Sequence, residues 1–232
     1  MLINVFLPCK RKSQRVPNKN KRKFANVSFG LIKIKINQLL KAKQIDKIFL
    51  STDDKKIIKF ANSLNKPKII VHERKKKNLS TANTQTQVLI DHACDLIKEG
   101  HILWTHVTSP IINEKIYDKI ILKYKKCLKK KYDSLMTVTK LGGFIWNEKS
   151  PVNYDNRRVK WPKTQTIKKL NKINSAVYLN SVENYKKYSD RIGKKPFMYE
   201  LNPFYGLDID GIDDFILGEY IFKNRKRIVP KH

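Results

Sequence analysis

L-I-N-V-F-L-P-C-K-R-K-S-Q-R-V-P-N-K-N, residues 2–20, is the stretch that decides the fold of this 232-residue chain. Residues 2–8 are almost all apolar, which predicts a strand buried on both faces, as in a parallel sheet. A basic loop follows directly. Ligands of open parallel sheets bind beyond the carboxyl ends of the strands, so this loop lies where a ligand is expected.

The residues after the loop alternate between helical and strand patterns. We expect helices at 31–42, 55–64 and 114–130, and strands at 47–51, 68–71, 101–107 and 134–139. A further helix, capped by Ser80 or Thr81 and closed by Gly100, is expected to bury the apolar residues within 88–97. This alternation predicts an α/β fold with a mostly parallel central sheet and helices on both faces. With 41% apolar residues, the chain is expected to form one domain, residues 1–232.

The last third contains a stretch without clear periodicity. Residues 141–172 are mainly polar, and we interpret them as an inserted flap or oligomerisation arm. Trp146 and Trp161 lie there, where burial at a subunit interface competes with stacking on a base or sugar. Strands are then expected at 173–179, 197–200 and 205–209, with helices at 182–188 and from the Asp-rich turn through 222.

The formal charge of +30 does not by itself indicate a nucleic-acid partner. Lysines are spread over predicted helices, strand ends and loops, so we interpret the basic surface as solvated and expect no specific nucleic acid. No apolar run approaches about 18 residues, so no membrane span is expected. The three cysteines, Cys9, Cys94 and Cys127, are far apart, which fits a reducing cytoplasm and predicts neither a disulfide framework nor a zinc site.

The loop at 8–20 has the composition of an anion site. It carries Lys10, Arg11, Lys12, Arg15 and Lys19, but it has neither the glycine pattern of a P-loop nor that of a dinucleotide-binding turn. Phosphate would therefore be bound by side-chain cations. The alternative is an ordinary basic surface loop; the position at a strand end favours the anion site.

A second cluster of charged residues is acidic. Asp208 and Asp210 alternate on a predicted strand, so both carboxylates point the same way and suit a divalent cation such as Mg²⁺. Asp213 and Asp214 follow in the expected first turn of a helix, where the helix dipole favours acids. Helix capping alone would explain the second pair, whereas the first pair exceeds what a cap requires.

These segments resemble those of a known enzyme family. The stretch at 8–20 resembles the P-A-R-x-x-S-K-R-x-P-x-K-N loop of the CMP-sialic acid synthetase (acylneuraminate cytidylyltransferase) family. In the same order, similar family segments match S-T-D-D at 51–54, E-R-K-K-K-N-L-S-T at 73–81, H-V-T-S-P at 106–110, N-S-A-V-Y at 174–178 and L-D-I-D at 207–210. The resemblance spans nearly the whole chain.

The resemblance implies a Rossmann-like nucleotidyltransferase fold and a homodimer formed through a small inserted dimerisation segment. It implies a cytoplasmic enzyme that joins CTP to an acidic keto sugar, such as a sialic acid-like nonulosonate, to give a CMP-sugar and pyrophosphate. Mg²⁺ is the implied cofactor.

The same resemblance implies which residues bind the nucleotide, the sugar and the metal. CTP would be bound by Pro8, Lys10, Arg11, Ser13, Arg15, Lys19, Asn20, Arg74, Lys75, His106 and Ser109, and the sugar by Asn174, Ser175 and Ala176. Asp208 and Asp210 would bind the metal and, with Lys19, form the catalytic set. Lys19 would balance charge on the departing pyrophosphate.

Three positions depart from the family pattern. Lys10 stands where the loop usually has Arg, Gln14 where it has Lys, and His106 where the family has the glutamine taken to read the cytosine. A lysine keeps the charge of arginine but not its planar, bidentate fork. These changes indicate either a subgroup with an altered choice of base or sugar, or a weakened enzyme.

Two other function classes remain open at this point. A glycosyltransferase-like protein would use Asp208 and Asp210 to bind a metal and a ready-made sugar nucleotide, but the basic loop has more cations than a diphosphate donor needs. A nucleic-acid-binding protein is supported only by the net charge.

Overall fold

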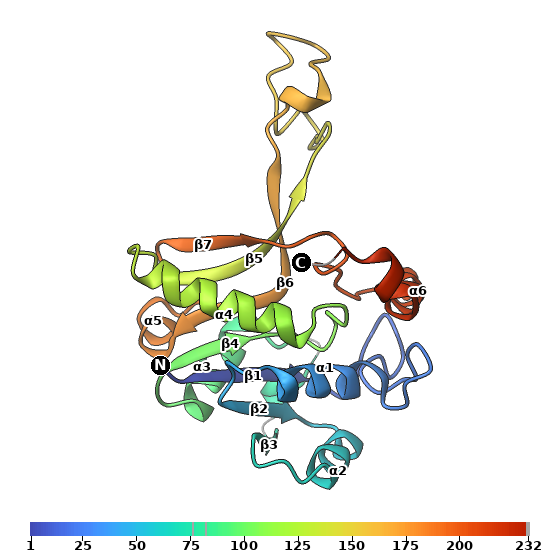
Figure 1. Ribbon diagram of the computed structural model, residues 1–232, viewed down its shortest axis with the longest axis vertical. Coiled ribbons are helices and arrows are strands. Elements are labelled where there is room, and N and C mark those ends of the chain that lie inside the picture. The colour runs from blue at the N-terminus through green and yellow to red at the C-terminus, as the bar shows by residue number, and fades with distance from the viewer. Residues whose placement is uncertain (76, 82, 231–232) are drawn as a thin grey trace.

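The computed structural model describes residues 1–75, 77–81 and 83–230, and a single mixed sheet forms its centre (Figure 1). The strands are β1 (Ile3–Cys9), β2 (Lys47–Thr52), β3 (Ile69–Glu73), β4 (His101–Trp104), β5 (Ser134–Leu141), β6 (Leu170–Ser181) and β7 (Pro196–Glu200). Their order across the sheet is β3-β2-β1-β4-β6-β5-β7. β6 is antiparallel to β4 and β5, and the other neighbouring pairs are parallel, which confirms the mostly parallel sheet.

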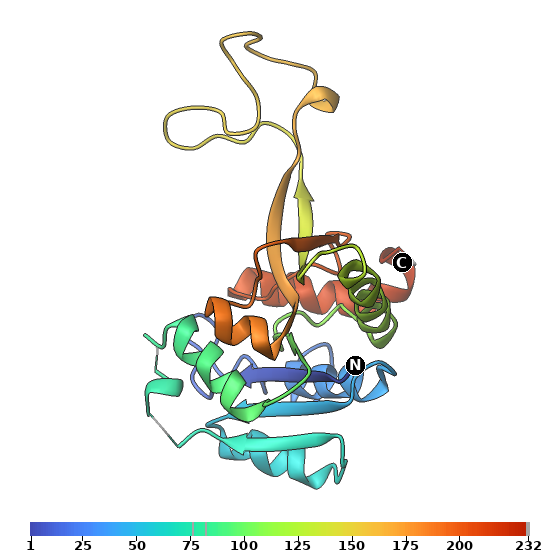
Figure 2. The ribbon, with the colours of Figure 1, turned by 90° about the vertical axis from the view of Figure 1, so that its left-hand side faces the viewer.

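Helices cover both faces of the sheet, as predicted (Figure 2). They are α1 (Gly30–Lys41), α2 (Lys55–Ser63), α3 (Thr86–Leu96), α4 (Glu114–Leu128), α5 (Val182–Tyr188) and α6 (Ile212–Ile228). α1, α2, α4 and α6 contribute buried residues to the larger core, and α3 and α5 contribute to the smaller one. Across the described residues, no helix has the length and apolar character needed to cross a bilayer.

β1 is buried on both faces, in agreement with its sequence. Ile3, Val5 and Leu7 enter the larger core, whereas Phe6 enters the smaller core and meets the Trp104 ring edge-on, with 4.7 Å between centroids. Burying an aliphatic or aromatic side chain of this size contributes about 1.5–3 kcal/mol. The strand therefore anchors the basic loop that follows it.

Two expected elements end or begin elsewhere. The strand expected at 101–107 stops at Trp104, because the chain then turns through a bond from the Ser109 N–H to the His106 carbonyl. Ser80 and Thr81 do not cap a helix, since α3 begins only at Thr86. The Thr84 hydroxyl instead donates to the Asn78 carbonyl, 2.7 Å away, and this bond stabilises a separate turn.

The strand expected at 205–209 is absent from the described chain. A turn takes its place, closed by a 3.0 Å bond from the Gly206 N–H to the Asn202 carbonyl. The Ile209 N–H then donates to the Thr108 carbonyl, at 2.8 Å. Asp208 and Asp210 are therefore positioned by contact with residues after β4 and not by strand alternation.

Residues 141–172, called the arm below, project away from the sheet (Figures 1 and 2). β5 and β6 continue into the arm as a hairpin, in which Leu141 pairs with Leu170. Farther out, the buried amide of Asn153 donates to the carbonyls of Gly143 and Lys168, at 2.8 and 3.0 Å. One asparagine thus ties together the loops of the arm.

Gly30 joins the basic loop to α1. Its φ is +30°, and a Cβ built on it would lie 1.9 Å from the Arg22 carbonyl oxygen and 3.1 Å from the Cβ of Phe24. Phe24 in turn packs edge-on against Phe215 of α6, with 5.1 Å between ring centroids. Only glycine lets the end of the loop lie this close to α1.

We expect Gly30→Ala to lower the free energy of unfolding by about 2–4 kcal/mol, because a side chain there meets backbone and the φ angle is unfavourable. Urea unfolding measures the loss. Gly142→Ala is the matched control, since a Cβ at Gly142 meets nothing within 4 Å. Equal stability of the two variants would contradict this account of the loop.

Candidate active site

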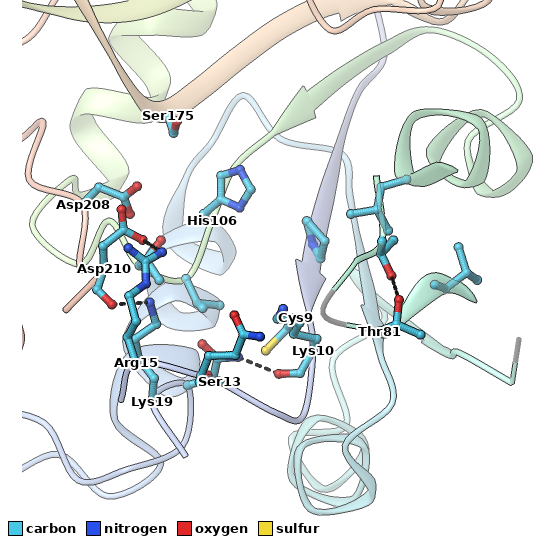
Figure 3. Close-up of a pocket in the computed structure, with 18 of the residues that line it drawn as sticks. Cys9, Lys10, Ser13, Arg15, Lys19, Thr81, His106, Ser175, Asp208 and Asp210 are labelled. Atoms are coloured by element: carbon cyan, nitrogen blue, oxygen red, sulfur yellow. Dashed lines mark hydrogen bonds and ion pairs between the residues drawn. The ribbon is translucent and has the colours of Figure 1, made fainter. Parts of the chain in front are cut away.

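One pocket lies at the carboxyl ends of β1 and β4, with a volume of about 380 Å³ (Figure 3). The basic loop and the turn before α6 form one side of it, and Thr81 lies on the other side. Its lining residues are Pro8, Cys9, Lys10, Ser13, Gln14, Arg15, Lys19, Asn20, Arg74, Leu79, Thr81, Thr84, Leu89, His106, Val107, Thr108, Ser175, Asp208 and Asp210.

The two charged clusters found in the sequence meet in this pocket. An Arg15 Nη2–H donates to Asp210 Oδ1 at 2.9 Å, and the Lys19 ammonium donates to the Ile209 carbonyl at 2.5 Å. Both partners of the ion pair are more than half exposed, so the pair is weak and open to exchange with a ligand. Burial lowers the pKa of Lys19, and the charges of Asp210 and Asp208 oppose that shift.

The basic loop is held in shape by its own polar residues. The amide of Asn20 is buried and donates to the Lys10 carbonyl at 2.9 Å. Lys21 forms an ion pair with Asp54, which also caps α2 by accepting from the Lys56 N–H. Asn20 therefore shapes the site in addition to lining it.

Asp208 carries an unsatisfied carboxylate oxygen. Its Oδ1 is buried and has no hydrogen-bond partner among the described residues. Burial raises the pKa of Asp208, with the nearby Asp210 adding to the shift and a hydrogen bond from Thr108 opposing it. A cation at Oδ1 would supply the missing partner, which suits the oxygen chemistry of a divalent metal.

No group of three or more His, Cys, Asp and Glu side chains in the part of the chain that the structure describes is arranged to hold a metal. A cation here would need further oxygen ligands, such as phosphate, besides Asp208 and Asp210. Asp214 is engaged otherwise: its Oδ2 accepts from the Asp210 and Gly211 N–H groups, at 3.0 and 2.8 Å.

Arg74 lines the end of the pocket near Thr81 and Thr84. Its Nε–H donates to Ser51 Oγ at 2.9 Å and its Nη1 to the Leu79 carbonyl at 2.8 Å. The buried Nη2 has no partner among the described residues. Burial lowers the pKa of Arg74, yet the guanidinium stays charged and keeps an open donor.

His106 lies on the opposite side of the pocket from Thr81, in the direction of Ser175 and Asp208 (Figure 3). Its Nε2 accepts a 3.1 Å hydrogen bond from the Trp104 indole N–H. Burial, reinforced by the positive charge of Arg191, lowers the pKa of His106 to about 3. The imidazole is therefore neutral at physiological pH.

The predicted residues Arg11 and Lys75 do not appear among the described residues lining this pocket. The exposed Arg11 is held through its backbone N–H, which donates to Asp53 Oδ1 at 2.6 Å. Lys75 lines a neighbouring cavity together with His72, Asp91 and Asp95.

Ser109, Asn174 and Ala176 also lie behind the surface of the pocket. The side-chain oxygen of Asn174 accepts from the Thr137 hydroxyl and from the Ala176 N–H, at 2.7 and 3.2 Å. Its amide donates to Thr139 at 3.0 Å. Asn174 therefore fixes the backbone of β6 on both sides of Ser175, which does line the pocket and has a φ of +57°.

A buried polar chain under the pocket begins at Lys35 of α1. Its ammonium donates to the Ser109 carbonyl and to the Tyr117 hydroxyl, at 2.7 and 2.6 Å. Tyr117 donates to Thr105, because the Thr105 proton is used in a 2.7 Å bond to the Ala176 carbonyl. Burial lowers the pKa of Lys35 well below its usual value.

Several lining residues were not selected from the sequence. They include Cys9, Leu79, Thr84, Leu89, Val107 and Thr108, which are brought together only by folding. Burial raises the pKa of Cys9 to about 12, so its thiol is not a nucleophile at neutral pH. Cys9, Leu79, Val107 and Thr108 lie within the quoted segments but carry no charge that would single them out, and Thr84 and Leu89 lie outside any motif.

We expect Asp208→Asn to raise the free energy of unfolding by about 1 kcal/mol at pH 7, because it removes a poorly compensated buried charge. The raised pKa of Asp208 in the folded protein costs stability only at pH values where this carboxylate is ionised. The stability gained by Asp208→Asn should therefore vanish near pH 3, where Asp208 is mostly protonated in both the folded and the unfolded protein. Urea titrations at both pH values test this. Asp213→Asn, which changes an exposed carboxylate, is the control. If Asp208→Asn were less stable than wild type at pH 7, the Asp208 carboxylate would not be a poorly compensated buried charge.

Comparisons with known proteins identify the family of the chain. Residues 5–215 match the family model described as "Cytidylyltransferase". Two pseudaminic acid cytidylyltransferases of Campylobacter jejuni subsp. jejuni, from serotypes O:2 and O:23/36, are 27% and 28% identical to the chain over 132 residues. Each match covers 53% of this chain and 55% of the relative, so it spans about half the length of these curated proteins.

Solved structures show the same fold at low identity. A CMP:2-keto-3-deoxy-manno-octonic acid synthetase, solved as a complex with CTP, superposes with a TM-score of 0.67 at 10% identity, over 97% of this chain and 100% of that one. A 4-diphosphocytidyl-2C-methyl-D-erythritol synthase from Anaerococcus prevotii gives 0.63 at 16% identity, over 96% of both chains. Together with the family match over most of the sequence, the pocket and its sheet lead to one assignment: the chain belongs to the cytidylyltransferase family.

Proposed function

We propose that the protein transfers CMP from CTP to a hydroxyl of an acidic keto sugar and releases pyrophosphate. The observation that carries the proposal is the convergence in one pocket of the basic loop, an aspartate oxygen without a partner among the described residues (Asp208 Oδ1) and an arginine donor likewise without one (Arg74 Nη2). The family match and the names of the relatives support it.

The triphosphate fits the side of the pocket formed by the basic loop. Lys10, Ser13, Arg15 and Lys19 line that side, and Lys19 reaches the turn that bears Asp210. We place the cytosine at the opposite end, near Thr81 and Thr84, where the free Nη2–H of Arg74 complements the acceptor edge of the base. A donor-only guanidinium favours O2 and N3 of cytosine over the N3–H of uracil.

Asp208 and Asp210 are the residues that would hold Mg²⁺, because Asp208 Oδ1 lacks a partner among the described residues and the Asp210 carboxylate is held by an exposed, exchangeable ion pair. When bound, Mg²⁺ neutralises charge on the phosphates and polarises the α-phosphate. The displacement itself needs the chain's own cations. Binding would require Arg15 to release Asp210, which transfers the arginine to a phosphate.

In the proposed reaction, the sugar hydroxyl oxygen attacks the α-phosphorus in line. A bond from oxygen to phosphorus forms, the bond to the β-phosphate bridging oxygen breaks, and pyrophosphate leaves with that electron pair while the hydroxyl proton passes to water. Arg15 and Lys19 line the pocket where they would stabilise the leaving charge. Ser175 and His106 would border the sugar, and Asn174 would hold Ser175 in place.

The first test is pyrophosphate release with Mg²⁺ from each of the four ribonucleoside triphosphates, paired with pseudaminic acid, sialic acid and an eight-carbon keto acid. We expect release only with CTP and one class of acidic sugar. Cleavage of a preformed sugar nucleotide, with no release from CTP, would instead support a glycosyltransferase-like protein.

Within this assay, Asp210→Asn should lower kcat by at least about 100-fold while the variant stays folded, because it removes a metal ligand without changing volume. Asp213→Asn is the matched control, since Asp213 is exposed and not a pocket-lining residue among those described. Full activity of Asp210→Asn would refute the metal assignment.

We also propose that the arm joins two copies of the chain. Its exposed apolar residues are Leu141, Phe144, Trp146, Val152, Val159 and Trp161, and Trp161 is 71% exposed. Phe144 packs edge-on against Trp161 and Tyr154 at 5.2 Å, so the arm presents an aromatic surface. Such surfaces in a projecting segment are typical of subunit interfaces.

The expected oligomer is a dimer in sedimentation velocity at micromolar concentration. Trp161→Lys should shift it towards monomer, because a charge replaces an aromatic contact. Leu122→Lys, a similar change at an exposed position of α4, should leave the dimer intact. Wild-type protein that sediments as a monomer would overturn the proposal.

A further inference from the structure

The side chain of Arg191 is held by aromatic rings and, among the described residues, by no ion pair. Its guanidinium lies over the ring of Tyr178 at 4.1 Å and over the ring of Trp104 at 5.1 Å. Its Nε–H is buried without a hydrogen-bond partner, and the described residues offer the guanidinium no ion pair. Arginine has five N–H donors, so a half-buried guanidinium that packs on ring faces and has one buried, unpaired N–H keeps unused binding capacity.

The imidazole of His106, whose pKa the charge of Arg191 helps to lower, is held in a single tautomer. Trp104 has only a donor N–H, so His106 Nε2 must accept and the ring proton must be on Nδ1. Because His106 lines the pocket, its Nδ1–H is a neutral donor available to a ligand. Burial and the charges of Arg191, Lys35 and Lys19 lower the pKa of His106 to about 3, which preserves this form.

Ser175 completes the group. Its hydroxyl lies 3.2 Å from the hydroxyl of Tyr178, whose ring supports Arg191. We call Trp104, His106, Ser175, Tyr178 and Arg191 the Arg191 cluster. In Figure 3, His106 and Ser175 lie on the side of Asp208 and away from Thr81, so the cluster adjoins the end of the pocket opposite the proposed base site.

An acidic sugar acceptor needs positive charge and a hydrogen-bond donor at the end of the pocket that His106 and Ser175 line. In a cyclic 2-keto acid sugar, the carboxylate is attached to the same carbon as the attacking hydroxyl. The carboxylate must therefore approach the α-phosphate, close to the two aspartates that repel it. A positive charge and a hydrogen-bond donor are needed on the facing wall to offset this repulsion.

We propose that the Arg191 cluster is the carboxylate subsite of the acceptor, with His106 Nδ1–H donating to the carboxylate and Arg191 supplying the counter-charge behind the ring. This inference rests on the proposed function, because it assumes an acidic sugar acceptor. It moves His106 from reading the base to recognising the sugar. Both histidine and the family's glutamine are neutral donors, so the replacement keeps the required group.

Steady-state kinetics with separate variation of CTP and sugar tests the subsite. We expect Arg191→Met to raise the KM for the sugar by about 10-fold, because it removes the counter-charge behind the His106 ring, while the KM for CTP changes less than about twofold. Lys194→Met, which removes an exposed charge in the same loop, is the control. Arg191→Lys, which keeps the charge, should show a smaller loss. Equal rises in both KM values would point to a structural role and overturn the inference.

A second comparison uses the sugar acid and its methyl ester. Wild-type enzyme should prefer the acid, and Arg191→Met should lose most of that preference. His106→Leu should lose more affinity for the acid than His106→Gln, which retains a neutral donor. If Arg191→Met prefers the acid as strongly as the wild-type enzyme does, the carboxylate subsite is rejected, but the proposed cytidylyl transfer is not. Failure of wild-type enzyme to release pyrophosphate with any acid would instead reject both proposals.

Discussion

The part-buried hydrogen bond from Lys19 to the Ile209 carbonyl holds the basic loop against the turn that carries the two aspartates, and the rest of the pocket depends on this contact. It joins a loop near the start of the chain to a turn 190 residues later. The strands and helices between them are arranged so that these two segments meet at the carboxyl end of β1. Without the contact, the basic loop and the aspartates would be separate charged surfaces.

Hydrogen bonds and ion pairs within the protein satisfy only part of the charged groups in and beside the pocket. Asp208 Oδ1, Arg74 Nη2 and Arg191 Nε are all buried without partners among the described residues, although buried polar atoms are usually hydrogen-bonded. Leaving such atoms unpaired costs stability, which suggests that ligands complete them. The same arrangement accounts for the raised pKa of Asp208, because its carboxylate is ionised at a cost that a cation would offset.

The pocket has a rigid base and a more open rim. Beneath it, Lys35, Tyr117 and Thr105 form an ordered donor chain that ends on the Ala176 carbonyl and fixes the end of β4 against the middle of β6. At the rim, the exposed pair of Arg15 and Asp210 is free to exchange partners. Precise placement of reacting groups needs a base of this kind, whereas substrate entry needs a rim that opens.

The sequence by itself determined the alternating elements, the mostly parallel sheet and the placement of the basic loop, because burial on both faces leaves a clear apolar pattern in β1. It also marked Asp208 and Asp210, since concentrated acid stands out in a basic chain. Tertiary structure alone decided that Asn174 supports β6, that Lys75 lies at another cavity, and that Trp104 sets the tautomer of His106. These outcomes depend on contacts between segments distant in sequence or on the direction of one side chain, and neither leaves a local pattern that a sequence can reveal.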